Sequence, residues 1–173
     1  GARAARSVVL MIVTQQLPYD LSADDASRRL DPGSPLVLVC GELHVIHDPE
    51  INAAMPRLLR QNGAVAIPVD CFDPGDSAPA MAKIYWGDDR HSLRAAAAAR
   101  EARDVFPLLI GSFACGPSSF TEQIFRAILE GYPHTVLESD GHGGSAGFVT
   151  RIQAFLQSVR EFLASADPWK FAK

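Results

Sequence analysis

One cysteine of this chain stands where a metal ligand or a nucleophile could work. Cys115 lies in a turn, residues 112–118, between an apolar run and a helical pattern, and Gly116 follows it. The start of a helix has partial positive charge, which favours a thiolate, and a glycine lets the backbone approach a ligand closely. Cys115 is therefore a candidate ligand of a metal or an iron–sulfur cluster, or a nucleophile. The alternative is an inert, small side chain.

The other two cysteines also follow apolar runs. Cys71 comes directly after Asp70 at the end of residues 64–69, and Cys40 ends residues 36–40. If these runs are neighbouring strands, the three thiols could converge at one sheet edge, although the apolar surroundings of Cys40 indicate a core position. An odd number of cysteines without paired spacing argues against a disulfide framework. We therefore treat Cys71 as a second candidate metal ligand, after Cys115.

A second unusual turn, residues 140–147, contains Asp140, His142 and Gly143. His142 beside Asp140 could titrate near neutral pH, and an anion could bind at the helix start that follows. Residues 141–146 also match the G-x-G-x-x-A form of the dinucleotide fingerprint, but they belong to the last strand–helix unit and no acidic ribose ligand follows. We expect Asp140, His142 and Gly143, with Cys115 and Gly116, to bind a cofactor. A loop histidine with structural partners is the alternative.

His44 and His47 are three residues apart, with Asp48 next to them. This spacing suits a divalent metal, and a turn with surface histidines is the alternative.

The pattern around these turns alternates strands with helices, which indicates a parallel sheet. Continuous apolar runs are typical of strands covered on both faces. We expect an α/β fold, a single domain over residues 1–173, with a Rossmann-like parallel sheet of four to five strands flanked by helices. The expected strands are residues 7–13, 36–40, 64–69, 108–111 and 135–137. The expected helices are residues 22–30, 48–62 (kinked or started late by Pro56), 80–86, 90–103, 120–130 and 148–163.

Composition excludes several classes of function. The chain has 173 residues, an apolar share of 47% and a net charge of −4, so it lacks the basic footprint of a nucleic-acid-binding protein. No apolar run approaches the ~20 residues of a membrane span. We therefore expect a cytoplasmic protein without nucleic-acid or membrane partners. Gly1 in place of a starting methionine suggests a piece of a longer chain.

Four segments together resemble one protein family. They are residues 41–44 (GELH) with 48–52 (DPEIN), residues 113–120 (FACGPSSF), residues 137–140 (LESD) and residues 146–156 (AGFVTRIQAFL). This set resembles the acyl-CoA dehydratase activase-related proteins, also described as CoA-substrate-specific enzyme activases, and more distantly the C-terminal half of 2-hydroxyacyl-CoA dehydratase subunits (D-component-like domain). The resemblance covers about residues 36–163.

The resemblance implies a Rossmann-like domain and a [4Fe–4S] cluster held by three cysteines, of which Cys115 matches one. It implies that the other cysteines come from an N-terminal portion outside this chain or from a dehydratase partner. It further implies ATP-driven electron transfer or acyl-CoA dehydration, an acyl-CoA substrate and anaerobic metabolism. This chain lacks the ATP-binding motifs of the activases, and we expect it to be inactive alone. The alternatives are a non-catalytic binding domain that has lost the cluster, and a nucleotide- or CoA-binding Rossmann module.

Overall fold

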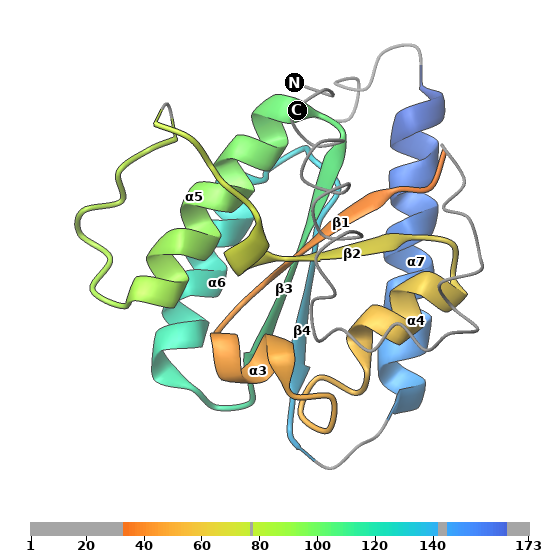
Figure 1. Ribbon diagram of the computed structural model, residues 1–173, viewed down its shortest axis with the longest axis horizontal. Coiled ribbons are helices and arrows are strands. Elements are labelled where there is room, and N and C mark those ends of the chain that lie inside the picture. Colours follow the sequence, from red (N-terminus) through yellow and green to blue (C-terminus); the bar gives the residue numbers. More distant parts are fainter. Residues whose placement is uncertain (1–32, 77, 142–144, 166–173) are drawn as a thin grey trace.

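The computed structural model describes residues 33–76, 78–141 and 145–165 of the chain. Within these residues the centre is a parallel sheet of four strands in the order β2-β1-β3-β4 (Figure 1). Its strands are β1 (Leu36–Cys40), β2 (Val65–Pro68), β3 (Val105–Ser112) and β4 (Thr135–Ser139). This confirms the expected α/β, Rossmann-like architecture. The expected strand at residues 7–13 and the expected helix at residues 22–30 lie outside the described residues.

The apolar runs form the core because both faces of the sheet are covered. β1 pairs with β2 on one side (Leu36 opposite Val65) and with β3 on the other (Leu36 opposite Val105). Val37 and Leu38 have no exposed surface, although they point to opposite faces. A strand buried on both sides reads as a continuous apolar run rather than as an alternating pattern.

Helices flank the sheet in two pairs. Helix α5 packs against α6, and α4 packs against α7; Figure 1 shows the two pairs on opposite sides of the sheet. The helices are α3 (Leu43–His47), α4 (Met55–Gln61), α5 (Gly87–Ala102), α6 (Gly116–Ile128) and α7 (Ser145–Ala164), and a 3-10 turn, η1 (Val69–Cys71), follows β2. Among the described residues, no helix is long and apolar enough to cross a membrane.

The expected helix over residues 48–62 was too long. Oδ1 of Asp48 does accept bonds from the backbone N–H groups of Glu50 and Ile51, but turns follow it and α4 begins only at Met55. The interruption has a local cause. Asn52 is buried, donates to the carbonyl of Ile46 and accepts from the N–H of Met55, which joins the end of α3 to the start of α4. The late start that Pro56 suggested is confirmed, since this proline lies in the first turn of α4.

The expected helix over residues 80–86 was wrong. The chain there is irregular, with Tyr85 almost fully exposed, and α5 begins at Gly87 instead of Arg90. Gly87, Asp88 and Asp89 indicated a break between two helices, but they form the first turn of α5. Acidic side chains in a first turn interact favourably with the helix dipole, which explains this start.

The connections create a switch point in the sheet. The chain leaves β1 to form β2 on one side, and β3 then returns to the other side of β1. In open parallel sheets the connections that follow such strands diverge to opposite faces, and ligands bind in the crevice outside the carboxyl ends of the strands. The carboxyl ends of β1 and β3 are therefore the place to look for a site.

Candidate functional site

Gly41 lets the chain turn sharply at the end of β1. Its φ is +145°, and a Cβ at this position would lie 2.2 Å from the carbonyl oxygen of Ile110 in β3. Its N–H donates to Oγ of Ser92 in α5 at 3.1 Å. A residue without a side chain is required where two backbones approach so closely. This contact fixes the direction in which the next residue, Glu42, leaves the sheet.

Glu42 connects the ends of the two central strands. Its Oε1 atom accepts hydrogen bonds from Sγ of Cys115 (3.3 Å) and from Oγ of Ser118 (3.2 Å). Its Oε2 atom lies 3.3 Å from Nε2 of His44, which forms an ion pair when the imidazole is protonated. One carboxylate at the start of α3 thus holds the start of α6, more than 70 residues away in sequence.

Cys115 lies where the sequence placed it, between β3 and α6. It is the N-cap residue of α6, and its carbonyl accepts the N–H of Ser119 at 3.0 Å. The preceding Ala114 has a φ of +60°, which tightens the turn. The side chain is half-buried and its thiol donates to Glu42, while Gly116 has open space at its Cβ position. The thiol of Cys115 is therefore positioned by its hydrogen bond to Glu42 and partly accessible to solvent at the switch point.

The turn after β4 lies next to the Cys115 turn. The N–H of Phe113 donates to the carbonyl of Ser139 at 2.8 Å, and the Ser139 hydroxyl donates to the carbonyl of Ile51. Gly141 then donates to Oγ of Ser139, and Asp140 is exposed. The predicted site residues His142 and Gly143 lie outside the described residues.

The three cysteines do not form one ligand group. All three are free thiols, and Cys40 is fully buried, where desolvation raises its pKa far above the ordinary value. Cys71 lies after β2, on the far side of β1 from the Cys115 turn, and desolvation, together with the charge of Asp70, raises its pKa. No group of three or more metal-ligating side chains occurs in the described parts of the chain. These residues therefore fit one ligand of a [4Fe–4S] cluster, not a complete set.

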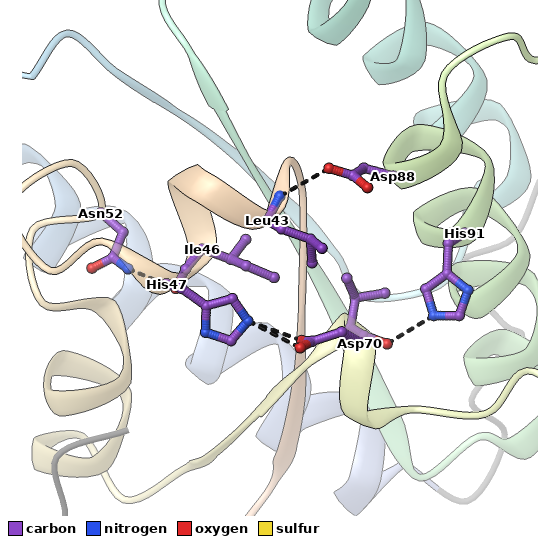
Figure 2. A network of polar contacts seen from close by, with 8 residues as sticks. Leu43, Ile46, His47, Asn52, Asp70, Asp88 and His91 are labelled. Atoms are coloured by element: carbon purple, nitrogen blue, oxygen red, sulfur yellow. Dashed lines mark hydrogen bonds and ion pairs between the residues drawn. The ribbon is translucent and has the colours of Figure 1, made fainter. Parts of the chain in front are cut away.

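His44 and His47 contact different acidic side chains. His44 is exposed beside Glu42, whereas Nε2 of His47 lies 3.1 Å from both carboxylate oxygens of Asp70. Figure 2 shows this pair bridging α3 and the turn after β2, with His91 of α5 bonded to the carbonyl of Val69 nearby. These contacts brace the carboxyl edge of the sheet. Both histidines thus have side-chain partners on the protein surface, as the interpretation of a turn with surface histidines expects.

The structure also contains a cavity that sequence reasoning missed. It has a volume of about 300 Å³ and lies where α3, α5 and α6 begin. Its wall includes Glu42, His44, Trp86, Asp88 and Asp89. Asp88 also accepts the N–H of Leu43 at 3.1 Å, which ties α5 to α3 (Figure 2). The signal in the sequence was the acidic pair itself, which we interpreted as a helix break.

Comparisons with known protein families, with curated proteins and with solved structures find no match to this chain.

Proposed function

We propose that this chain is a Rossmann-like domain of a CoA-substrate-specific enzyme activase or a 2-hydroxyacyl-CoA dehydratase-like protein. In this proposal Cys115 contributes one thiolate to a [4Fe–4S] site, and the remaining ligands come from another part of the protein or from a dehydratase partner. The site would serve ATP-driven electron transfer or acyl-CoA dehydration in the cytoplasm.

The observation that supports this proposal most is the meeting of the segments on which the resemblance depends. Residues 41–44 and 113–120 are joined through Glu42, which accepts from Cys115 and Ser118. Residues 137–140 join them through Ser139, which bonds to Phe113 and to Ile51 of residues 48–52. Segments that are distant in sequence but share one edge of the sheet are expected where a binding site is built.

The contacts define what the chain's own residues would do. Glu42 holds the Cys115 turn against the end of β1, and Gly41 allows the close approach of β1 and β3 that this requires. Cys115, half-buried at the rim, is available to a second protein surface. A cluster bound there would supply electron transfer, and the chain would supply one ligand and its orientation.

The test is iron and acid-labile sulfide analysis of the full-length protein, purified anaerobically, with a visible absorption spectrum. We expect iron and sulfide in the wild type, their loss in Cys115→Ser and their retention in Cys71→Ser. Cys71 is the matched control because it is a partly buried thiol at the same sheet edge but two strands away. A wild type without iron, or a Cys115→Ser variant with full iron content, would contradict the proposal.

A non-catalytic binding domain of the same fold is the second candidate. The observation that favours it is the absence of a complete ligand group in the described residues. It predicts no iron in any variant. A nucleotide- or CoA-binding module is the third candidate, and it would have to hold its phosphates away from the cavity at the switch point, because that cavity is acidic and would repel them.

A further inference from the structure

The cavity at the starts of α3, α5 and α6 has an unusual balance of charge. Three carboxylates line it, from Glu42, Asp88 and Asp89, and the only basic group in its wall is His44. Asp88 and Glu42 have hydrogen-bond partners, described above. Asp89 has no ion-pair partner among the described residues.

Asp89 distinguishes this cavity from an ordinary acidic surface. The residue is only 2% exposed, yet it lines the cavity. Desolvation raises its pKa, and the charges of Glu42 and Asp88 add to the shift, against a lowering effect of Thr121. Thr121, also fully buried, lies close enough for that effect, but its Oγ1 atom forms no hydrogen bond of normal distance and angle. A buried carboxylate without a cation is costly, so a positive charge in the cavity would be strongly favoured.

The helix dipole accounts for acidic side chains at this position but not for their burial. Asp88 and Asp89 lie in the first turn of α5, where negative charge is stabilising even when exposed to solvent. Asp88 is half-buried and needs no further explanation. Asp89 is buried but lines a cavity large enough for several non-hydrogen atoms, and the same wall includes Trp86, a residue that is 46% exposed.

We propose that this cavity binds the ammonium group of a small organic amine. Asp89 and Glu42 would accept its N–H bonds, and the ring of Trp86 would cover its alkyl part and attract its charge through the aromatic face. Trp86 is held in place by edge-to-face packing on Phe120, with ring centroids 6.4 Å apart. This site is independent of the iron–sulfur proposal, although both use Glu42.

The chemistry of the wall favours an organic cation over other ligands. Phosphates and carboxylates would meet three carboxylates and are excluded by charge. A divalent metal requires several converging ligands, and no such group is found within the described residues. A monovalent organic cation needs only one buried ion pair and an apolar wall, and Asp89 and Trp86 supply these.

The experiment is a titration with ethylammonium chloride, followed by tryptophan fluorescence. Trp86 and Trp169 are the only tryptophans of the chain, so a Trp169→Phe background reports on the cavity alone. A ligand with so few non-hydrogen atoms can reach a Kd of about 1 mM at best. Potassium chloride at equal ionic strength, magnesium chloride and ethanol are the matched controls for salt, for a metal and for an uncharged ligand of the same shape.

We expect a change in fluorescence that saturates with ethylammonium and no saturating change with the three controls. Asp89→Asn should weaken binding at least about tenfold, because it removes the buried charge, and Asp88→Asn by about threefold, since that side chain is more exposed. Glu130→Gln, an exposed acid beyond the opposite end of α6, should bind as the wild type does. Cys115→Ser should also bind normally, which separates this site from the proposed cluster.

Three results would overturn the proposal. One is a response to ethylammonium no larger than that to potassium chloride. Another is an Asp89→Asn variant that is folded by circular dichroism and binds with unchanged affinity. The third is saturation by magnesium, which would identify a metal site. If Asp89→Asn does not fold, Asp88→Asn together with the increase in melting temperature of the wild type on adding ethylammonium decides the question.

Discussion

Gly41→Ala should unfold this protein more readily than most single substitutions. The new Cβ would lie 2.2 Å from the carbonyl oxygen of Ile110, about 1 Å closer than non-bonded atoms approach, and both groups belong to backbone in the centre of the sheet. The φ of +145° adds strain of about 1–3 kcal/mol for a residue other than glycine. Relief would require β1 and β3 to separate where Cys40 pairs with Leu109. Loss of one or two hydrogen bonds there costs about 1 kcal/mol each.

The total is a loss of about 2–5 kcal/mol, a large part of the 5–15 kcal/mol typical of a domain. Urea unfolding followed by far-ultraviolet circular dichroism measures it. With a slope of about 2 kcal/mol per molar urea, the midpoint should fall by about 1–2.5 M. Gly116→Ala is the control, since its Cβ meets open space in the first turn of α6, and its midpoint should be unchanged or slightly higher. A Gly41→Ala midpoint within about 0.3 M of the wild type would refute the close approach of β1 and β3.

Two further predictions concern Tyr132 and His134, two polar residues shortly before β4. Tyr132 donates its hydroxyl proton to the carbonyl of Val105 at 2.9 Å, so Tyr132→Phe should cost about 1–2 kcal/mol in urea unfolding while its ring remains stacked on Phe106. An unchanged free energy of unfolding in Tyr132→Phe would mean that water replaces this hydrogen bond. Burial lowers the pKa of His134 below the ordinary 6.5 of histidine, and the charge of Arg126 lowers it further, against a raising effect of the bond to the carbonyl of Tyr132. The unfolded chain thus binds a proton first, and the stability that His134 contributes above pH 6.5 should fall as pH drops through its folded pKa. The free energy of unfolding should change less between pH 7 and pH 5 in His134→Asn than in the wild type. An equal change in both proteins would contradict the lowered pKa of His134.

Local patterns predicted the strands because burial on both faces leaves a simple signal in the sequence. The apolar run at residues 36–40 could hardly form anything else once turn residues bounded it. The start of the third strand was predicted less well. Proline is disfavoured inside a sheet, and the expected strand began directly after Pro107. In the structure β3 begins three residues before the expected strand, at Val105. The pairing of β3 with β4 begins only at Leu108. Pro107, which has no N–H to donate, therefore interrupts no pairing on the β4 side.

The helix starts were harder to predict because they involve contacts of individual side chains, some local and some distant in sequence. Asp48 accepts a backbone N–H of the turn that follows it, Asn52 joins α3 to α4 through both its amide groups, and α4 begins only at Met55. Similarly, Asp88 and Asp89 look like breakers in isolation. In the structure they form the first turn of α5, and Asp88 also accepts the N–H of Leu43, a contact across 45 residues. Such partners cannot be read from propensity alone.

The candidate site, too, could be predicted only in part from the sequence. Topology alone brings Cys115 to the carboxyl edge of the sheet, since any turn after a central parallel strand lies there. That its thiol would donate to Glu42, and that Glu42 would also border a cavity with Asp89, depends on side-chain directions that the sequence does not contain. Two glycines of the dinucleotide-like segment 141–146, Gly143 and Gly144, lie outside the described residues.

Glu42 is the residue at which the two proposals meet, and its two oxygens explain how they can be separated. Oε1 receives the bonds from Cys115 and Ser118, whereas Oε2 faces His44. Substitution of Glu42 would disturb both the thiol and the cavity, so a combined loss in Glu42→Gln identifies neither. Asp89→Asn and Cys115→Ser each remove one function and leave the carboxylate of Glu42 in place. Loss of amine binding in the first and of iron in the second would show two sites that share one carboxylate, and loss of both in either variant would show that they are one.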